Sequence, residues 1–147
     1  MAAAAAAGHV GIDVSVSCEA LGKFDGVKRR MELLGSVNGI SVYDDFAHHP
    51  TAIKTTLDGF AAKLRSTKSS YRLVAVIEPR SATMKSGVHQ DKLVQACVAA
   101  DEVLWYKGED IGLDFKSLVS SSVFESQVFS SVQEIVAFLT NSCRSGD

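Results

Sequence analysis

The chain has 147 residues, of which 46% are hydrophobic and 22% charged, as is typical of a single globular domain. Fifteen Lys and Arg residues against seventeen Asp and Glu residues give a net charge of −2, which excludes a strongly basic nucleic-acid binder. No apolar run reaches the roughly 18 residues of a membrane span. Cys18, Cys97 and Cys143 lack disulfide or metal-ligand spacing, which favours a reducing, cytoplasmic setting.

The two ends of the chain differ in character. Met1–Ala7 lacks the basic start of a secretory signal, and we interpret it as a leader or fragment edge, with the end of a helix as the alternative. Between Asp13 and Gly22, apolar residues recur at helical spacing and Asp13 is a plausible N-cap, which predicts a short helix. The polar end, Ser142–Asp147, is predicted to fray.

A hairpin and a helix are predicted next. Met31–Ser36 and Ile40–Phe46 have strand-like composition, and Asn38-Gly39 between them favours a tight turn because both residues tolerate positive φ. Pro50 is typical of a first helical turn, and apolar residues follow it at the helical period. The sequence therefore predicts a strand that leads into a helix across a short polar loop, residues 44–50.

Strands and helices alternate in the second half. Strands are expected at Leu73–Ile77, Glu102–Tyr106 and Gln127–Phe129, and helices at about Val88–Ala99, at Phe115–Val119 and after Ser131, which opens a capping-box pattern with Glu134. The LVAVI run of the first of these strands predicts burial on both faces. Glu78–Gly87 and Ser117–Ser122 are interpreted as loops, and Trp105 and Cys97 as core residues.

This order of elements predicts an α/β fold: a mainly parallel sheet flanked by helices, with an N-terminal β-hairpin. Ligands of such sheets bind at the carboxyl ends of the strands. Two polar loops, residues 44–50 and 78–87, follow strands of the predicted fold. We therefore expect the ligand site at these two loops.

The first loop combines two carboxylates and two imidazoles, in Asp44, Asp45, His48 and His49, immediately before a helix. A helix N-terminus offers unpaired N–H groups to an anionic ligand. One alternative is a metal site, although adjacent strand residues point to opposite faces and do not converge easily. Another is that the histidines only cap the helix and fill the loop.

The second loop carries Arg80, Ser81, Thr83 and Lys85. Arginine binds a carboxylate or phosphate through two parallel hydrogen bonds, and lysine adds a point charge, so an anion is the natural partner. The alternative is a solvated loop without a ligand. A third basic cluster, Lys28-Arg29-Arg30, precedes the hairpin and admits the same two interpretations.

Familiar nucleotide and hydrolase motifs are absent from the sequence. There is no G-x-x-x-x-G-K-[ST] phosphate loop, no G-x-G-x-x-G and no G-x-S-x-G. The chain therefore lacks the usual means to bind and split a nucleotide alone.

Three segments together resemble the Mur ligase family. They are GVKRRME at Gly26–Glu32, VYDDFAHHPTAI at Val42–Ile53 and EPRSATMKSGVH at Glu78–His89, in the order and spacing of that family. The second and third segments favour the members that attach a peptide over those that attach one amino acid. The similarity covers about Val10 to Asp101 and then weakens to the order of elements.

The resemblance implies two parts in this chain. Residues 1–24 would be a leader plus a helical remnant of the central ATPase domain, and residues 25–147 the Rossmann-like, C-terminal, peptide-binding domain. Arg30 would reach the ATP phosphates and Asp45 the nucleotide ribose. The substrate residues would be His48 and His49, near the incoming peptide, and Arg80, Ser81, Thr83 and Lys85, which would bind its carboxylates. No metal ligand is assigned to this chain.

The reaction implied by the resemblance is ATP-dependent amide formation through an acyl phosphate. The tripeptide L-Ala-γ-D-Glu-meso-diaminopimelate would be joined to UDP-N-acetylmuramate in peptidoglycan recycling, with ATP and Mg²⁺ held mainly by the central domain. The family's C-terminal domain continues into a final strand and a Ser-Asn-Gly loop, so this domain is expected to be truncated, with one sheet edge open. Without a phosphate loop, the chain alone is expected to be inactive.

Two interpretations from other classes stay open. One is a stand-alone, non-catalytic α/β module that binds a muropeptide or a protein partner. The other is a small metal hydrolase that uses Asp45, His48 and His49.

Overall fold

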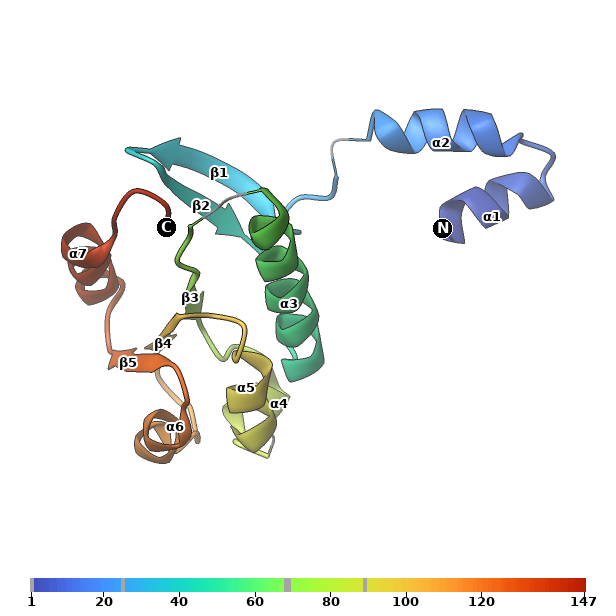
Figure 1. The fold of residues 1–147 in the computed structure, drawn as a ribbon. Helices are drawn as coiled ribbons and strands as arrows, with labels where there is room; N and C mark the ends of the chain where they lie inside the picture. The colour runs from blue at the N-terminus through green and yellow to red at the C-terminus, as the bar shows by residue number, and fades with distance from the viewer. Residues whose placement is uncertain (1, 25, 68–69, 89) are drawn as a thin grey trace.

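A computed structural model describes residues 2–24, 26–67, 70–88 and 90–147. Figure 1 shows the order of the helices and strands along the chain. The helices are α1 (Ala2–His9), α2 (Val14–Gly22), α3 (Pro50–Thr67), α4 (Ala82–Lys85), α5 (Gln90–Ala96), α6 (Phe115–Ser121) and α7 (Val132–Ser142). The strands are β1 (Glu32–Val37), β2 (Ile40–Asp44), β3 (Val74–Ile77), β4 (Glu102–Tyr106) and β5 (Glu125–Phe129). The expected domain boundary at Asp25 and the final motif residue His89 lie outside the described residues.

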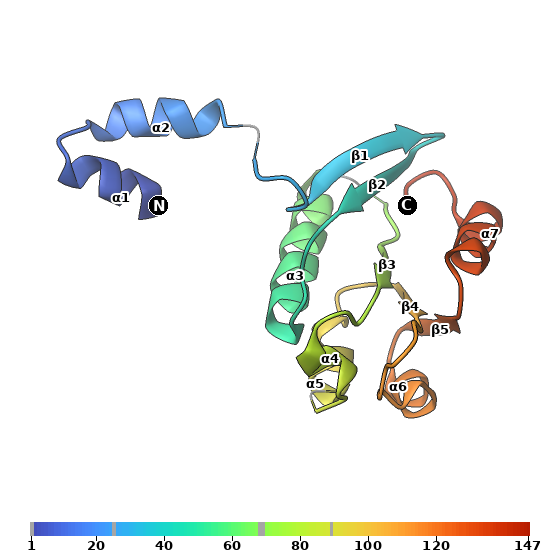
Figure 2. The same cartoon turned by 180° about the vertical axis from the view of Figure 1, so that it is seen from behind.

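The two N-terminal helices extend away from the rest of the chain (Figures 1 and 2). Helix α2 begins and ends where the sequence predicts: Asp13 is its N-cap and accepts a hydrogen bond from the Ser15 N–H at 2.8 Å. Its apolar side chains stay exposed, with Val14 at 63% and Leu21 at 45%. The alanine-rich start is helical from Ala2. Neither helix is therefore held by a core of its own.

The hairpin forms around the predicted turn. Strands β1 and β2 pair antiparallel with Val37 opposite Ile40, and Asn38 and Gly39 between them have φ angles of 53° and 81°. Two consecutive positive φ values define the tight turn that matches the twist of a hairpin. Strand β2 ends at Asp44, so the polar loop starts at the end of this strand.

The second sheet is parallel, with strand order β3-β4-β5. Figures 1 and 2 show α3 and α5 on one side of this sheet and α7 on the other. Trp105 and Cys97 are fully buried, which confirms both as core residues, and the Trp105 Nε1 donates to Ser126 Oγ at 2.9 Å. The mixed α/β class and the hairpin are both as predicted.

Three local predictions are wrong. Residues 73–77 are not buried on both faces: Val76 is 50% exposed, because β3 is an edge strand that pairs only with β4 among the described strands. The loop at 78–87 contains the short helix α4, which Ser81 caps. Residues 117–122 are mostly helical, because Asp114 caps α6 and the hydroxyls of Ser120, Ser121 and Ser122 donate to carbonyl oxygens of the preceding turn.

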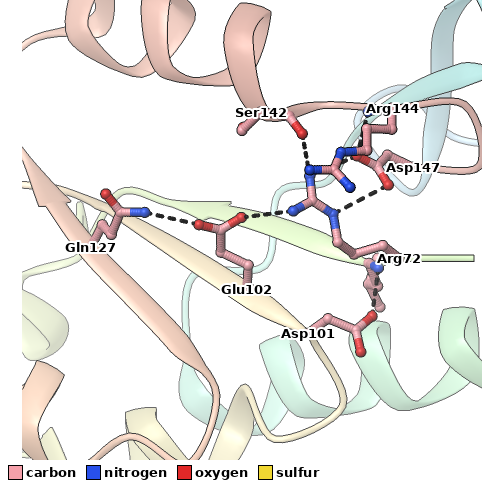
Figure 3. Close-up of polar contacts among 8 residues, drawn as sticks. Arg72, Asp101, Glu102, Gln127, Ser142, Arg144 and Asp147 are labelled. Atoms are coloured by element: carbon pink, nitrogen blue, oxygen red, sulfur yellow. Dashed lines mark hydrogen bonds and ion pairs between the residues drawn. The ribbon is translucent and has the colours of Figure 1, made fainter.

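The C-terminal end is also not frayed (Figure 3). The Ser41 N–H donates to the Asp147 carbonyl oxygen at 2.9 Å, and the Arg72 N–H donates to the Gly146 carbonyl oxygen at 3.4 Å. The Arg72 guanidinium lies 2.7 Å from the Asp147 carboxylate and 3.4 Å from that of Glu102. No local pattern indicates this pairing, because Arg72 and Asp147 are 75 positions apart.

The ion pair shifts the pKa of both partners. The hydrogen bond from Arg72 to Asp147 raises the pKa of the guanidinium. Burial works to raise the pKa of Asp147, but hydrogen bonds from Arg72 and from the Arg144 N–H outweigh it and hold the pKa below its usual value. Glu102, with only 2% of its surface exposed, also accepts a hydrogen bond from Gln127 at 3.0 Å. This network lies where β3 and β4 begin, so it stabilises the edge of the sheet opposite the polar loops.

The described helices include none that is both long enough and apolar enough to cross a membrane.

Candidate functional site

The two polar loops meet at the carboxyl ends of β2 and β3. The Ser81 hydroxyl donates to the His48 carbonyl oxygen at 3.0 Å. The same Oγ accepts a hydrogen bond from the Met84 N–H at 3.3 Å and so caps α4. One serine therefore starts the short helix and fixes it against the first loop, although β2 and β3 belong to different sheets.

The two histidines have different roles in the first loop. His49 precedes α3, and its Nδ1 accepts a hydrogen bond from the Thr51 N–H at 3.3 Å, as a helix cap does. His48 is exposed, with its Nδ1 3.0 Å from the Phe46 carbonyl oxygen. Because a carbonyl only accepts, this contact places the proton of neutral His48 on Nδ1. The capping alternative thus describes His49, while the His48 ring is exposed at the site.

Asp45 joins three segments. Its carboxylate accepts hydrogen bonds from the Met31 N–H at 3.0 Å, the Ala47 N–H at 2.9 Å and the Thr56 hydroxyl at 3.3 Å. These donors belong to the segment just before the hairpin, the first loop and α3. The half-buried carboxylate therefore has a structural role in this arrangement.

The segment around Arg30 is held against the first loop. Arg29 and Met31 both have positive φ, 57° and 49°, a strained conformation for residues with a side chain. The Phe46 N–H donates to the Arg29 carbonyl oxygen at 2.8 Å, and the Arg29 guanidinium lies 3.0 Å from Asp44 and 5.0 Å from the centre of the Phe46 ring. Arg30, between the two strained residues, is exposed. Its charge is thus carried on a fixed backbone next to the site.

The second loop exposes most of its polar groups. Arg80 Nε lies 3.6 Å from Glu78 Oε1, in an ion pair whose side chains are 68% and 44% exposed. Thr83 is exposed and Lys85 is half-buried. An exposed ion pair of this kind contributes little, so a ligand carboxylate can replace Glu78 on Arg80.

Sequence reasoning missed the groups that follow β4. A cleft of about 530 Å³ opens at the carboxyl ends of β3, β4 and β5. It is lined by Glu78, Lys85, Tyr106, Lys107, Gly108, Glu109, Ile111 and Ser130. The rule that places ligands at strand ends applies to β4 as well, and applied there it would have indicated Tyr106–Glu109.

The described residues do not suit a metal ion. They include no group of three or more His, Cys, Asp and Glu side chains close enough to hold one. The Asp45 oxygens accept three protein hydrogen bonds, and His49 Nδ1 accepts one. This arrangement does not favour the metal-hydrolase alternative.

The fold is that of an α/β domain in which two loops with charged and polar side chains meet at the carboxyl ends of β2 and β3. Residues 29–147 match the family described as Mur ligase, glutamate ligase domain. The chain therefore belongs to the Mur ligase family, as the three sequence segments indicate.

The relatives are ligases that act on UDP-N-acetylmuramate. The UDP-N-acetylmuramate–L-alanyl-γ-D-glutamyl-meso-2,6-diaminoheptanedioate ligases are 44% identical over 82% of this chain in Haemophilus influenzae and 39% over 99% in Escherichia coli K12. The crystal structure of a murein peptide ligase from Psychrobacter arcticus 273-4 covers 99% of this chain at 46% identity, with a TM-score of 0.72. A UDP-N-acetylmuramate–alanine ligase from Thermotoga maritima shares the fold, with a TM-score of 0.77 over 97% of the chain at 23% identity.

The chain spans under a third of each of these proteins: 26% and 31% of the two curated relatives and 31% of the Psychrobacter arcticus chain.

Proposed function

We propose that this chain is the peptide-binding, C-terminal domain of an ATP-dependent cytoplasmic ligase for peptidoglycan recycling. The substrates would be those in the names of the relatives, UDP-N-acetylmuramate and L-alanyl-γ-D-glutamyl-meso-2,6-diaminoheptanedioate. The observation that carries the proposal is the hydrogen bond from Ser81 to His48, because it joins two loops rich in anion-binding groups into one site.

The second loop would bind the peptide through its carboxylates. Arg80 offers a planar guanidinium in a weak, exposed ion pair, and Lys85 and Thr83 add a charge and a hydroxyl beside it. The Ser81 hydroxyl is engaged with His48 and Met84, so its part is to position the loop.

The first loop would lie near the incoming peptide and the reacting centre. The exposed His48 ring can contact the peptide directly, whereas His49 acts through the start of α3. Arg30 would contact the ATP phosphates. Asp45 accepts three hydrogen bonds from protein groups, one of them from the Met31 N–H next to Arg30. These bonds favour a role for Asp45 in positioning Arg30 over a contact with the ribose.

ATP and Mg²⁺ would be held mainly outside this chain, because its sequence has no phosphate loop. The purified chain, given ATP, Mg²⁺ and both substrates, is therefore expected to make no UDP-muramyl tripeptide. Product formation by the chain alone would overturn this division of roles.

A domain exchange tests the function itself. The chain would replace the matching segment of the Psychrobacter arcticus murein peptide ligase, which aligns with 99% of it. We expect the chimera to form UDP-muramyl tripeptide, and its Arg80→Ala variant to show a raised KM for the tripeptide and an unchanged KM for ATP. A folded chimera that binds ATP and makes no product would contradict the proposal.

A further inference from the structure

The turn that carries Arg30 has a strained backbone on both sides of that residue. Arg29 and Met31 have φ angles of 57° and 49°. Residues with a side chain seldom adopt this left-handed conformation, and it persists only where surrounding contacts hold it. The contacts of this turn therefore determine where Arg30 lies.

Acidic side chains hold the two strained residues by their backbone N–H groups. Glu32, the half-buried first residue of β1, accepts a hydrogen bond from the Arg29 N–H at 2.8 Å. Asp45, directly after β2, accepts one from the Met31 N–H at 3.0 Å. Arg30 is thus flanked by two N–H groups that are both bound to carboxylates at the base of the hairpin.

The position of Glu32 is unfavourable for the hairpin itself. Glu32 lies directly opposite Asp44 in the antiparallel pair, and like charges at opposite positions destabilise paired strands. Arg29 contacts both carboxylates: its N–H donates to Glu32, and its guanidinium lies 3.0 Å from Asp44. Glu32 therefore contributes to the turn before β1 rather than to the pairing of the strands.

The two arginines of this turn differ in what they contact. The Arg29 guanidinium is engaged by Asp44 and lies 5.0 Å from the centre of the Phe46 ring. Arg30 is exposed, and within the described part of the chain it takes part in no ion pair. The turn thus fixes its backbone through Arg29 and leaves the charge of Arg30 available to a ligand.

We propose that Glu32 is a positioning residue for Arg30, an inference that rests on the proposed function, in which Arg30 contacts the ATP phosphates. Glu32 acts through the Arg29 N–H and does not itself touch the nucleotide. Without this acceptor, the backbone of Arg29 can relax out of its strained conformation and displace Arg30. A cation that is already in place loses less conformational entropy on binding than a mobile one, so Glu32 favours the binding of ATP.

The chimera with the Psychrobacter arcticus enzyme tests this role by steady-state kinetics. Glu32→Ala removes the acceptor, whereas Glu32→Gln keeps an oxygen that can accept the Arg29 N–H. Glu125→Ala, at the exposed first position of β5, is the matched control. We expect Glu32→Ala to raise the KM for ATP roughly fivefold and to leave the KM for the tripeptide unchanged, with Glu32→Gln within about twofold of the parent chimera. Glu125→Ala is expected to change neither KM.

Amide hydrogen exchange of the purified chain separates a local change in the turn from a loss of fold. Glu32→Ala should speed exchange at Arg29, whose N–H loses its partner, and leave exchange at the buried Trp105 unchanged. Faster exchange throughout the core would show a general structural role for Glu32 and overturn the inference.

The kinetics distinguish failure of the inference from failure of the proposed function. Arg30→Ala in the same chimera gives the effect of losing the cation itself. If Arg30→Ala raises the KM for ATP and Glu32→Ala does not, the inference is wrong and the proposed function stands. Equal increases in both KM values in Glu32→Ala would also overturn the inference. A folded parent chimera that binds ATP and makes no product contradicts the proposed function, and the inference falls with it.

Discussion

The hydroxyl of Ser81 lies 3.0 Å from the carbonyl oxygen of His48, and this hydrogen bond joins two loops that are 33 positions apart in the chain. Both loops follow strands, but β2 belongs to the hairpin and β3 to the parallel sheet. The bond therefore positions the hairpin side of the site against the sheet side. Binding of a ligand between the loops therefore depends on the distance between the two loops as well as on their charged groups.

Replacing Ser81 with alanine removes this hydrogen bond and the cap of α4 together. We expect a loss of about 1 kcal/mol in the free energy of unfolding, measured with urea, and weaker binding of the tripeptide. Ser86→Ala is the matched control at the other end of the same helix, where the hydroxyl donates only to the Thr83 carbonyl oxygen. Equal effects of the two substitutions on binding would show that Ser81 does not position the site.

Asp45→Ala removes the acceptor of three hydrogen bonds. The Met31 and Ala47 N–H groups would lose their partner, which we expect to cost about 2 kcal/mol of stability and to speed amide hydrogen exchange at both positions. Asp58→Ala is the control, because its carboxylate makes only an exposed ion pair with Lys54 on α3. Unchanged exchange at Met31 in Asp45→Ala would refute the positioning role.

Asp147 gives the stability of the chain an acid-dependent component. Its pKa in the folded chain lies below the ordinary value of 3.8, so the folded state favours the charged carboxylate. This stabilisation is fully present above about pH 4 and is lost as the pH falls through the lowered pKa of the folded state. Urea unfolding between pH 7 and pH 2 should therefore show a smaller acid-induced loss in Asp147→Asn. An identical pH profile for the variant would contradict the ion pair with Arg72.

The cysteines are expected to differ in reactivity. Burial raises the pKa of the Cys97 thiol to about 12 and removes it from solvent, whereas Cys18 is exposed. Because the thiolate is the reactive form, iodoacetamide at pH 8 should alkylate Cys18 rapidly and Cys97 only after unfolding. Peptide mapping by mass spectrometry measures this, and rapid labelling of Cys97 in the folded chain would contradict its burial in the core.

Features with a local physical cause were predictable from the sequence. Asp13 starts α2, Asn38-Gly39 forms the turn of the hairpin, and Ser131 with Glu134 forms the capping box of α7. Each depends on residues within a few positions of one another. The rule for strand ends indicated both polar loops, although β2 pairs in the hairpin and not in the parallel sheet.

The wrong or missing predictions depended on long-range contacts. The partial exposure of Val76 results from the edge position of β3, and the order at the C-terminus from Arg72, which no periodicity reveals. Asp45 was selected for its charge, but its contacts with Met31 and Thr56 form only once the chain is folded. The cleft was missed because Lys107–Asp114 has no recognisable motif.

A chemical-shift map of the ¹⁵N-labelled chain during titration with the tripeptide tests the central claim most directly. If the joined loops form the peptide site, the largest amide shifts should fall at His48–Thr51 and Arg80–Lys85, and Ser81→Ala should reduce both sets together. Shifts confined to other segments, or none at millimolar peptide, would contradict the assignment of the site to these loops.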